Sequence, residues 1–461
     1  GIFLASNFGS LYTFLSPDKN FFLFSSEKNA LLKVLKNNHD FLGLRGDPSI
    51  SQLDRRETYF CKIGKTISVS CSDNHEIQTN DTINSKQKKI FHSIPNILNI
   101  KRCSKCVLPV TYPNISFDKL GVCNFCANHK PYEPFGEDSF ERLLSKHRSG
   151  NQKHDCLVAF SGGRDSSYGL YALKRLYGMN PVAFTYDWGM VTAIARRNQA
   201  RILGELGVEH IVRSADISKK RRAIGLNVSA WLKRPHLGMV PLFSAGDKEF
   251  FKIARDLQGE TGIPLVIFCG GQPIEKTDFK VGFAGVKESS EWNTLFSFPL
   301  EGKLKLAAFY AFQYLRNPRY FNSSFLDSLR AFQSSFVTKD HFTYLYKYIR
   351  WDETKIDKVL RENFGWEVAP YTNNTWRIGD GYTSFINYIY FEMAGFSEFD
   401  VFRSQQIREG LIDRNTALKK ISDENKFDIE VLVEFFSQIG MSSSDVMDQI
   451  SRFPKTYDLS C

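Results

Sequence analysis

The sequence lacks long apolar runs. Its most hydrophobic stretches, such as residues 264–269 of the 461, extend for about six residues, whereas a helix needs about 20 to span a bilayer. No basic leader precedes the apolar residues at the start, so we expect neither a membrane span nor a secretory signal. Internal repeats are absent as well. Since 42% of the residues are hydrophobic and 14% aromatic, the composition excludes a disordered chain, and the length predicts two to four domains.

An excess of acidic residues is also missing, because the formal net charge is +10. This charge favours anionic partners, but it does not choose between phosphorylated metabolites, nucleotides and nucleic acid. Four of the nine cysteines form two C-x-x-C pairs within a short span. That spacing indicates a metal site rather than disulfides, and therefore a reducing cytoplasm.

The two cysteine pairs are Cys103 with Cys106 and Cys123 with Cys126, separated by sixteen residues. Each C-x-x-C turn directs two thiolates at one ion, and the intervening loop brings the second pair opposite the first. Four sulfur ligands leave no open coordination position, so the pattern predicts a structural Zn²⁺. A redox dithiol and an iron–sulfur cluster are the alternatives.

Apolar strands alternate with amphipathic helices in the middle of the chain. The expected strands are residues 156–160, 181–186, 208–212 and 264–269, and the expected helices are 167–177 and 192–206. This alternation predicts an α/β fold with a parallel sheet. After about residue 303 the pattern becomes helical, as in residues 304–315 and 384–393, and indicates a separate domain.

The N-terminal part has a different pattern. An apolar run at residues 21–24 precedes polar residues 25–27 and helix-like residues 29–35, which predicts a strand, a cap and a helix. Residues 72–96 are rich in Asn, Asp, Thr, Lys and Gln. They are a candidate linker, with a solvated surface loop as the alternative.

A Gly-Ser segment lies between the first strand of the α/β region and its helix. It reads Ser161, Gly162, Gly163, Arg164, Asp165, Ser166, Ser167. Glycines let the backbone approach an anion, the helix N-terminus offers free N–H groups, and serine hydroxyls add donors. The segment lacks the lysine of the kinase and GTPase loop. It predicts a phosphate site, with an ordinary turn as the alternative.

Residues 161–166 resemble the S-G-G-x-D-S motif of the PP-loop ATP pyrophosphatases, which include asparagine synthetase, GMP synthetase and tRNA-thiolating enzymes. The resemblance implies an adenine nucleotide alpha hydrolase-like fold that splits ATP between its α and β phosphates. It implies that the loop, from Ser161 to Ser167, holds pyrophosphate and that Asp165 helps to hold Mg²⁺. Asp187, after the second strand, is similar to an aspartate that faces the nucleotide, although a turn residue would fit equally well.

Residues 102–126 resemble the N-terminal segment of the N-acetyl sugar amidotransferases, bacterial enzymes of lipopolysaccharide and nonulosonic acid pathways that convert an acetamido group to an acetamidino group. Residues 269–275, with Gly271 and Glu275, resemble a further family segment, as do residues 363–366 and 407–410. The resemblance implies ATP, Mg²⁺ and Zn²⁺ as cofactors and a nucleotide sugar or sugar acid as substrate.

The resemblance also suggests how the chain is divided. Residues 11–12 and 24–32 are similar to the tail of a class II glutaminase domain, whose nucleophilic cysteine is missing here, so we expect a separate glutaminase subunit or free ammonium to supply ammonia. The predicted parts are 1–60 glutaminase-like and inactive, 61–100 linker, 101–135 zinc segment, 150–300 PP-loop domain, and 301–461 helical domain.

Several roles stay open at this point. Arg164 and Lys276 are candidates for stabilising phosphate charge, although a solvated side chain is the expected state of Arg164. Arg377, Asp380 and Arg403 suit either sugar or diphosphate contacts, or surface ion pairs. One alternative function is a PP-loop sulfur transferase acting on tRNA, with Cys269 as its thiol. Another is a zinc-ribbon nucleic-acid-binding protein without catalysis. We do not expect a nucleic-acid partner, and a homodimer is compatible with the sequence.

Overall fold

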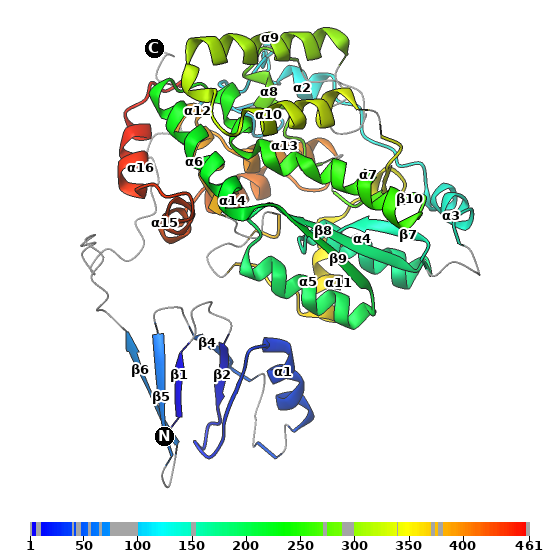
Figure 1. Cartoon of the computed structure of the whole chain (residues 1–461), viewed down its shortest axis with the longest axis vertical. Coiled ribbons are helices and arrows are strands. Elements are labelled where there is room, and N and C mark those ends of the chain that lie inside the picture. The colour runs from blue at the N-terminus through cyan, green and yellow to red at the C-terminus, as the bar shows by residue number, and fades with distance from the viewer. Residues whose placement is uncertain are drawn as a thin grey trace. The chain divides into compact units, whose positions relative to one another are not determined.

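The computed structural model divides the chain into two compact units, Gly1–Lys88 and Lys89–Cys461 (Figure 1). The structure describes residues 2–5, 11–38, 41–42, 48–53, 57–63, 67–73, 100–148, 154–270, 274–287, 299–338, 340–369, 374–376 and 381–457.

The described residues of the first unit form two antiparallel three-stranded sheets and one helix. One sheet has the order β1-β5-β6 and the other β3-β2-β4. The bounds are β1 Ile2–Ala5, β2 Leu11–Leu15, β3 Phe22–Ser25, α1 Lys28–Asn37, β4 Ser51–Leu53, β5 Glu57–Ile63 and β6 Ile67–Asp73. The strand and helix predicted for residues 21–35 are confirmed. The predicted linker, residues 61–100, begins inside β5 and contains β6, since these short runs pair with each other; residues 74–99 lie outside the described ones.

The second unit is built on a parallel sheet with the strand order β11-β10-β7-β8-β9. The strands are β7 Cys156–Ala159, β8 Pro181–Asp187, β9 Glu209–Ser214, β10 Leu265–Phe268 and β11 Thr343–Tyr344. The predicted α/β class is therefore confirmed. The sequence analysis missed β11, because a strand of two residues has no detectable period and forms only where β10 offers its edge.

Helices cover both faces of this sheet (Figure 1). Cys156 and Val158 of β7 pack in a core with α4 Arg164–Tyr171, α5 Ala193–Leu206 and α11 Glu353–Phe364. Leu157 points the other way and packs with α7 Phe250–Thr261. Because successive strand residues alternate between faces, the apolar run of β7 supplies both cores.

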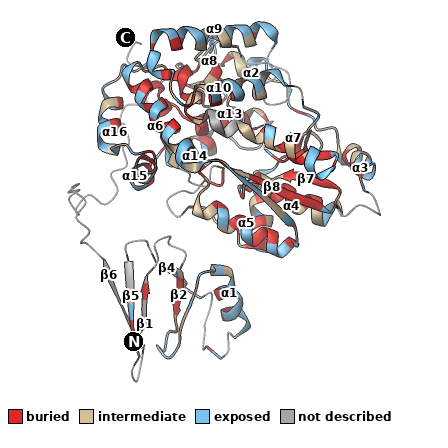
Figure 2. Cartoon of the chain, in the orientation of Figure 1, coloured by how far each residue is buried: buried red, intermediate tan, exposed pale blue. Residues whose placement is uncertain are grey.

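Most of the remaining helices pack around a third core. The remaining helices are α2 Asn124–Ala127, α3 Glu137–Ser145, α6 Ile217–Lys233, α8 Phe279–Gly282, α9 Leu300–Arg316, α10 Phe325–Phe332, α12 Gly381–Ala394, α13 Glu398–Arg408, α14 Arg414–Glu424, α15 Ile429–Gln438 and α16 Ser443–Ser451. Of these, α3 packs instead in the core of α4, α5 and α11, and α14 packs against Val107. The apolar helix α12 is buried almost all round (Figure 2). The cysteine segment shares its core, so the predicted zinc segment, sheet and C-terminal helices lie in one compact unit. Within the ranges described, no helix is long and apolar enough to cross a membrane.

Candidate nucleotide site and cysteine cluster

The Gly-Ser loop lies at the carboxyl end of β7, the central strand of the sheet. From β7 the chain runs outward through β8 to β9 on one side of the sheet and then crosses back to β10 and β11 on the other side, and parallel α/β sheets bind ligands at such a switch point. Gly162 has φ +77°, and a Cβ there would lie 2.5 Å from the backbone oxygen of Ala195. Only glycine suits both constraints. The loop is so short that α4 begins at Arg164, three residues before the predicted start.

Hydrogen bonds hold the loop from within and from behind. The Ser161 N–H donates to Ser166 Oγ at 3.2 Å, and the two hydroxyls lie 3.0 Å apart. Behind the loop, Trp366 Nε1 donates to the carbonyl oxygen of Gly162 at 3.0 Å. The loop is thus pre-organised before any anion binds.

Arg164 is buried, which contradicts the solvated side chain expected from the sequence. Its guanidinium donates to Asp165 Oδ2 at 3.0 Å, to Glu275 Oε1 at 2.8 Å and to Glu353 Oε1 at 3.2 Å. Although burial disfavours the charge, these three carboxylates raise the pKa of Arg164. The difference arises because residue 164 occupies the first turn of α4, where its side chain faces the protein interior.

Asp165 is bound on both carboxylate oxygens. Oδ1 accepts from Trp351 Nε1 at 2.8 Å and from Arg164 Nε at 3.1 Å, and Oδ2 accepts from Arg164. Ser167 is fully buried, and its Oγ has no hydrogen-bond partner among the described residues.

A network of buried ion pairs continues from Arg164 into the C-terminal helices. Arg403 donates to Glu353 Oε2 at 2.7 Å and forms a close ion pair with Glu424. Burial would raise the pKa of Glu353, but Arg403 and Arg164 hold it at about 2. Arg403 therefore serves a buried network, whereas Arg377 and Asp380 lie outside the described residues.

A cavity of about 1030 Å³ opens in front of the loop. Of the residues predicted to bind ATP or act on it, Ser161, Gly163, Arg164, Asp165, Ser166 and Glu275 line this cavity. Gly162, Ser167, Asp187 and Lys276 are not among its lining residues, and Gly271 lies outside the described residues. The volume lies at the upper end of the usual range for ligand pockets, so the cavity has room for a nucleotide and an acceptor together.

Asp187 and Lys276 have other contacts. Asp187 Oδ1 accepts from the Gly189 N–H at 3.0 Å, which is the turn role weighed as the alternative. The Asp187 carboxylate also forms a close ion pair with Arg196. Lys276 lies near His129. Burial, Arg408 and Lys276 together lower the pKa of that histidine to about 4.

The sequence analysis missed two charged cavity residues. Asp278 and Lys280 follow β10 and line the cavity. Lys280 Nζ pairs with Glu398 at 2.6 Å. The Asp278 carboxylate accepts no hydrogen bond from any described residue, and burial raises its pKa against the opposing charge of Lys276. The polar residues that follow the strand at residues 264–269 could have indicated Asp278 and Lys280. No local pattern indicated that Trp351 and Glu353 lie at the site.

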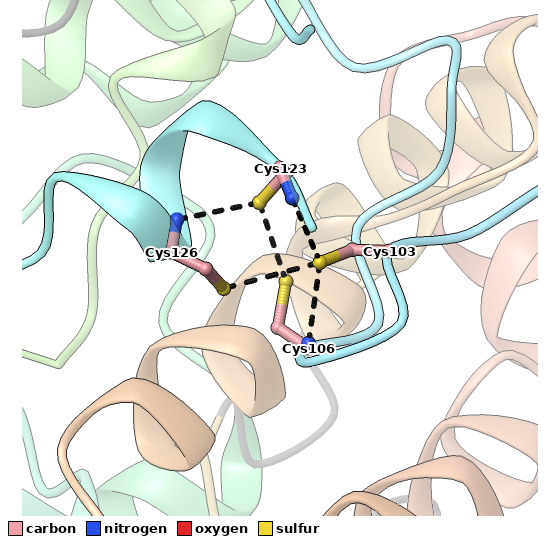
Figure 3. A group of neighbouring side chains, drawn as sticks. All are labelled: Cys103, Cys106, Cys123 and Cys126. Atoms are coloured by element: carbon pink, nitrogen blue, oxygen red, sulfur yellow. Dashed lines mark hydrogen bonds between the residues drawn. The ribbon is translucent and has the colours of Figure 1, made fainter. Parts of the chain in front are cut away.

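The four cysteines converge as the spacing predicted (Figure 3). All four are buried, and their sulfur atoms lie within 4.8 Å of one another. The Cys103–Cys126 and Cys106–Cys123 sulfur separations are 4.0 Å and 3.8 Å. Zn–S bonds of about 2.3 Å in a tetrahedron require sulfur separations of about 3.8 Å, so the cluster fits one tetrahedral ion.

Two arginines from the C-terminal helices support the cluster. Arg408 Nη1 lies 3.8 Å from Cys106 Sγ, and Arg414 Nε donates to the carbonyl oxygens of Cys103 and Cys106 at 3.3 and 3.1 Å. The Cys123 N–H also donates to Cys103 Sγ at 3.2 Å. Such contacts stabilise thiolates and orient them toward a metal.

Comparisons with known proteins give limited likeness. No family model matches the chain. An uncharacterized protein of Methanocaldococcus jannaschii (MJ1599) is 27% identical over 119 residues, which are 25% of this chain and 43% of the relative, so the match spans less than half of that relative.

Two solved structures match the chain at low sequence identity and low TM-score. The NH3-dependent NAD synthetase from Campylobacter jejuni is 13% identical, with 44% of this chain and 96% of that chain covered, at a TM-score of 0.22. The U34-tRNA thiolase NcsA from Methanococcus maripaludis, solved with its [4Fe-4S] cluster, is 12% identical, with 78% and 92% covered, at a TM-score of 0.27. Because both superpositions are poor, the fold described above rests on this chain's own strands and helices.

Proposed function

We propose that this chain is an ATP-dependent N-acetyl sugar amidotransferase of the PP-loop superfamily, which converts an acetamido group of a nucleotide sugar or sugar acid into an acetamidino group. One observation carries the proposal. The S-G-G-x-D-S loop faces a cavity at the carboxyl end of the central strand, in a chain whose cysteine segment also resembles that family.

In this proposal the loop binds the β and γ phosphates of ATP. The hydroxyls of Ser161 and Ser166 and the first N–H groups of α4 donate to them. The carboxylates of Asp165 and Glu275 face the same cavity, and carboxylate oxygens are the ligands that Mg²⁺ prefers, so these residues would hold the ion. Bound there, Mg²⁺ would neutralise charge on the departing pyrophosphate.

The chemistry follows from the poor leaving group of an amide. The acetamido oxygen attacks the α phosphorus of ATP and releases pyrophosphate, and loss of the amide proton leaves an O-adenylyl imidate. Ammonia then adds to the imidate carbon, and AMP departs with the former carbonyl oxygen, leaving the amidine. The cavity walls must keep water from the imidate during this step.

Asp278 suits the proton transfer in the second step. Its carboxylate lines the cavity without a hydrogen bond from any described residue, and its burial raises its pKa. A carboxylate with a raised pKa is a better base than an ordinary one, because its pKa lies nearer to the working pH. We assign it the proton that the attacking ammonia loses. A separate glutaminase or free ammonium would supply that ammonia.

Zn²⁺ in the cysteine cluster would have a structural role, because four thiolates complete its tetrahedron. The cysteine segment and α12 share one core, so the ion would hold the segment against the C-terminal helices.

The contacts of Cys269 do not favour the tRNA sulfur transferase. Such an enzyme needs a reactive thiolate near the nucleotide. Cys269 lines the cavity but is almost fully buried, and this burial raises the pKa of its thiol. A Cβ on Gly169 would lie 2.3 Å from its sulfur, so the thiol is packed directly against α4.

The decisive test is mass spectrometry of acetamido sugars incubated with the full chain, ATP, Mg²⁺ and ammonium. Replacing a carbonyl oxygen by NH lowers the product mass by about one unit, and one AMP should form per amidine. Asp165→Asn should abolish both products, while Asp216→Asn, at an exposed helix cap, should change neither. AMP formation that depends on tRNA and a persulfide would support the sulfur transferase. Salt-sensitive RNA binding without AMP would support the non-catalytic alternative.

A further inference from the structure

The cavity has an apolar arm that the proposed chemistry does not use. Away from the loop, α9, α10 and the segment between them line it with Tyr310, Tyr314, Leu315, Phe321, Phe325 and Phe332. These helices contribute no charged side chain to the lining. Phosphate groups gain little from such walls, whereas burial of a hydrocarbon chain gains about 25 cal/mol for each Å² removed from water.

Three of the lining residues of this arm are also exposed. Leu315 is 74% exposed, Phe321 54% and Leu329 51%, so the arm opens to solvent between α9 and α10. Leu300 and Leu304 extend the apolar surface along α9. At 100° per residue, these two leucines and Leu315 fall within about 60° of one another around the helix axis.

The opposite side of α9 is the side that packs on the protein. Leu306 and Gln313 are buried there. A helix that packs on a protein by one side usually presents polar residues on the other. The outer side of α9 is exposed in Figure 2, and its leucines are exposed without a covering element among the described residues. Exposed leucines of this kind are expected where a helix contacts the protein core on one side and another apolar environment on the other.

Basic residues flank the apolar surface. Lys305, Arg316, Arg319 and Arg330 are exposed on or between the two helices, where Glu301 is the exposed acidic residue and pairs with Lys305 at 2.6 Å. Asp327 of α10 is buried and pairs inward with Lys220 at 2.8 Å and, at the longer distance of 3.9 Å, with Arg330. Exposed leucine and phenylalanine beside lysine and arginine are typical of helices that lie in the interface of an anionic membrane.

We propose that the exposed face of α9 and α10 binds an anionic lipid bilayer, and that the apolar arm takes the hydrocarbon chain of a lipid-linked sugar acid presented from it. The proposed bilayer contact does not depend on the proposed function, whereas the identity of the acceptor does. A symmetric contact between two copies would bring the same basic patch, with arginines 316, 319 and 330, from both copies into one interface. A bilayer instead offers both an apolar interior and negative charge.

Sedimentation with lipid vesicles tests the surface. The full chain should bind vesicles of phosphatidylcholine with about one-third phosphatidylglycerol, and binding should weaken as salt is raised. Leu300→Ser combined with Leu304→Ser should reduce the bound fraction at least tenfold. Leu120→Ser combined with Leu176→Ser removes two exposed leucines elsewhere and should leave binding unchanged.

Displacement of the fluorescent fatty acid cis-parinaric acid tests the arm. Ala311 lines the cavity and Ala308 does not, although both lie on the exposed side of α9. Ala311→Trp should weaken parinaric acid binding at least tenfold, and the matched Ala308→Trp should not.

Two results would overturn the proposal. One is wild-type protein that stays in the supernatant with anionic vesicles, including the case in which the two leucine substitutions instead dissociate a dimer. The other is parinaric acid binding that Ala311→Trp leaves unchanged. A chain that binds vesicles and parinaric acid but never ATP would contradict the proposed function and leave the membrane contact standing.

Discussion

The cysteine segment and the Gly-Ser loop are both short motifs, but they are held in different ways. The four sulfurs that converge come from positions 103 to 126, and neighbouring backbone N–H groups donate to them. The loop is held by Trp351 and Trp366, which lie 186 and 204 positions away from the residues they bind. The first motif carries most of its geometry within itself, whereas the second depends on how the C-terminal half packs. Changes to one should therefore leave the other intact.

The largest effect is expected from removing the metal ligands. Cys103→Ser should lower the zinc content from about one ion per chain to less than a tenth, because structural zinc binds with about 10–16 kcal/mol in zinc-finger peptides. A strong chelator should have the same effect. Elemental analysis and a thermal unfolding scan measure both.

The matched control is Cys156→Ala in β7, which should keep the ion because Cys156 lies outside the cluster. ATP binding that is lost in step with zinc would show that the two motifs are not independent.

The next-largest effect is expected from breaking the ion pairs that connect the loop to distant segments of the chain. Arg164→Met leaves three carboxylates around a buried site without their shared cation, and breaking a buried pair costs about 3–5 kcal/mol. Urea unfolding should show this loss while zinc content stays unchanged.

Arg361→Met removes the partially exposed pair with Asp357 on α11 and should cost less than about 1 kcal/mol. Arg164→Lys keeps a charge and should fall between the two variants. Equal stability of Arg164→Met and Arg361→Met would show that the network does not support the fold.

Acid should weaken the same network through Glu353. The pKa of Glu353 is about 2 in the folded chain against an ordinary 4.5, so its ionisation contributes stability that is complete above about pH 4.5 and is lost as the pH falls to about 2. The difference corresponds to about 3 kcal/mol.

Unfolding free energies of wild type and Glu353→Gln should therefore converge as the pH falls through this range. Glu362→Gln, at an exposed position on the same helix, should run parallel to wild type. A gap between wild type and Glu353→Gln that does not change between pH 5 and pH 2 would contradict the assigned pKa.

The smallest effect is expected from adding a single methyl group to the loop, at Gly162. Gly162→Ala forces a Cβ onto a positive φ and against the Ala195 carbonyl, and such strain costs about 1–3 kcal/mol. We expect at least tenfold weaker ATP binding by calorimetry with unchanged zinc. Gly204→Ala in α5 meets no atom within 4 Å and should be neutral or slightly stabilising, since alanine favours a helix. Unchanged ATP binding in Gly162→Ala would show that ATP binding does not depend on the conformation of the loop.

Patterns within one segment were enough to predict most of the sheet and the cluster. Residues 264–269 and, apart from Thr185, residues 181–186 are apolar runs, and they form β10 and β8 within a residue or two of the predicted bounds. The C-x-x-C spacing predicted the convergence of the cysteines. The burial of Arg164 was not predictable in the same way, because its partner Glu353 lies 189 positions away and no local pattern links the two.

The chain's own order of residues decided which segments become strands, where the glycine turn falls and which four thiols can meet, because these depend on neighbours along the backbone. Tertiary packing alone decided that Asp165 is bound by Trp351, that Asp278 faces the cavity without a described partner and that leucines 300, 304 and 315 of α9 stay exposed. Each of these depends on the environment of a side chain, which is set by segments far away in the sequence.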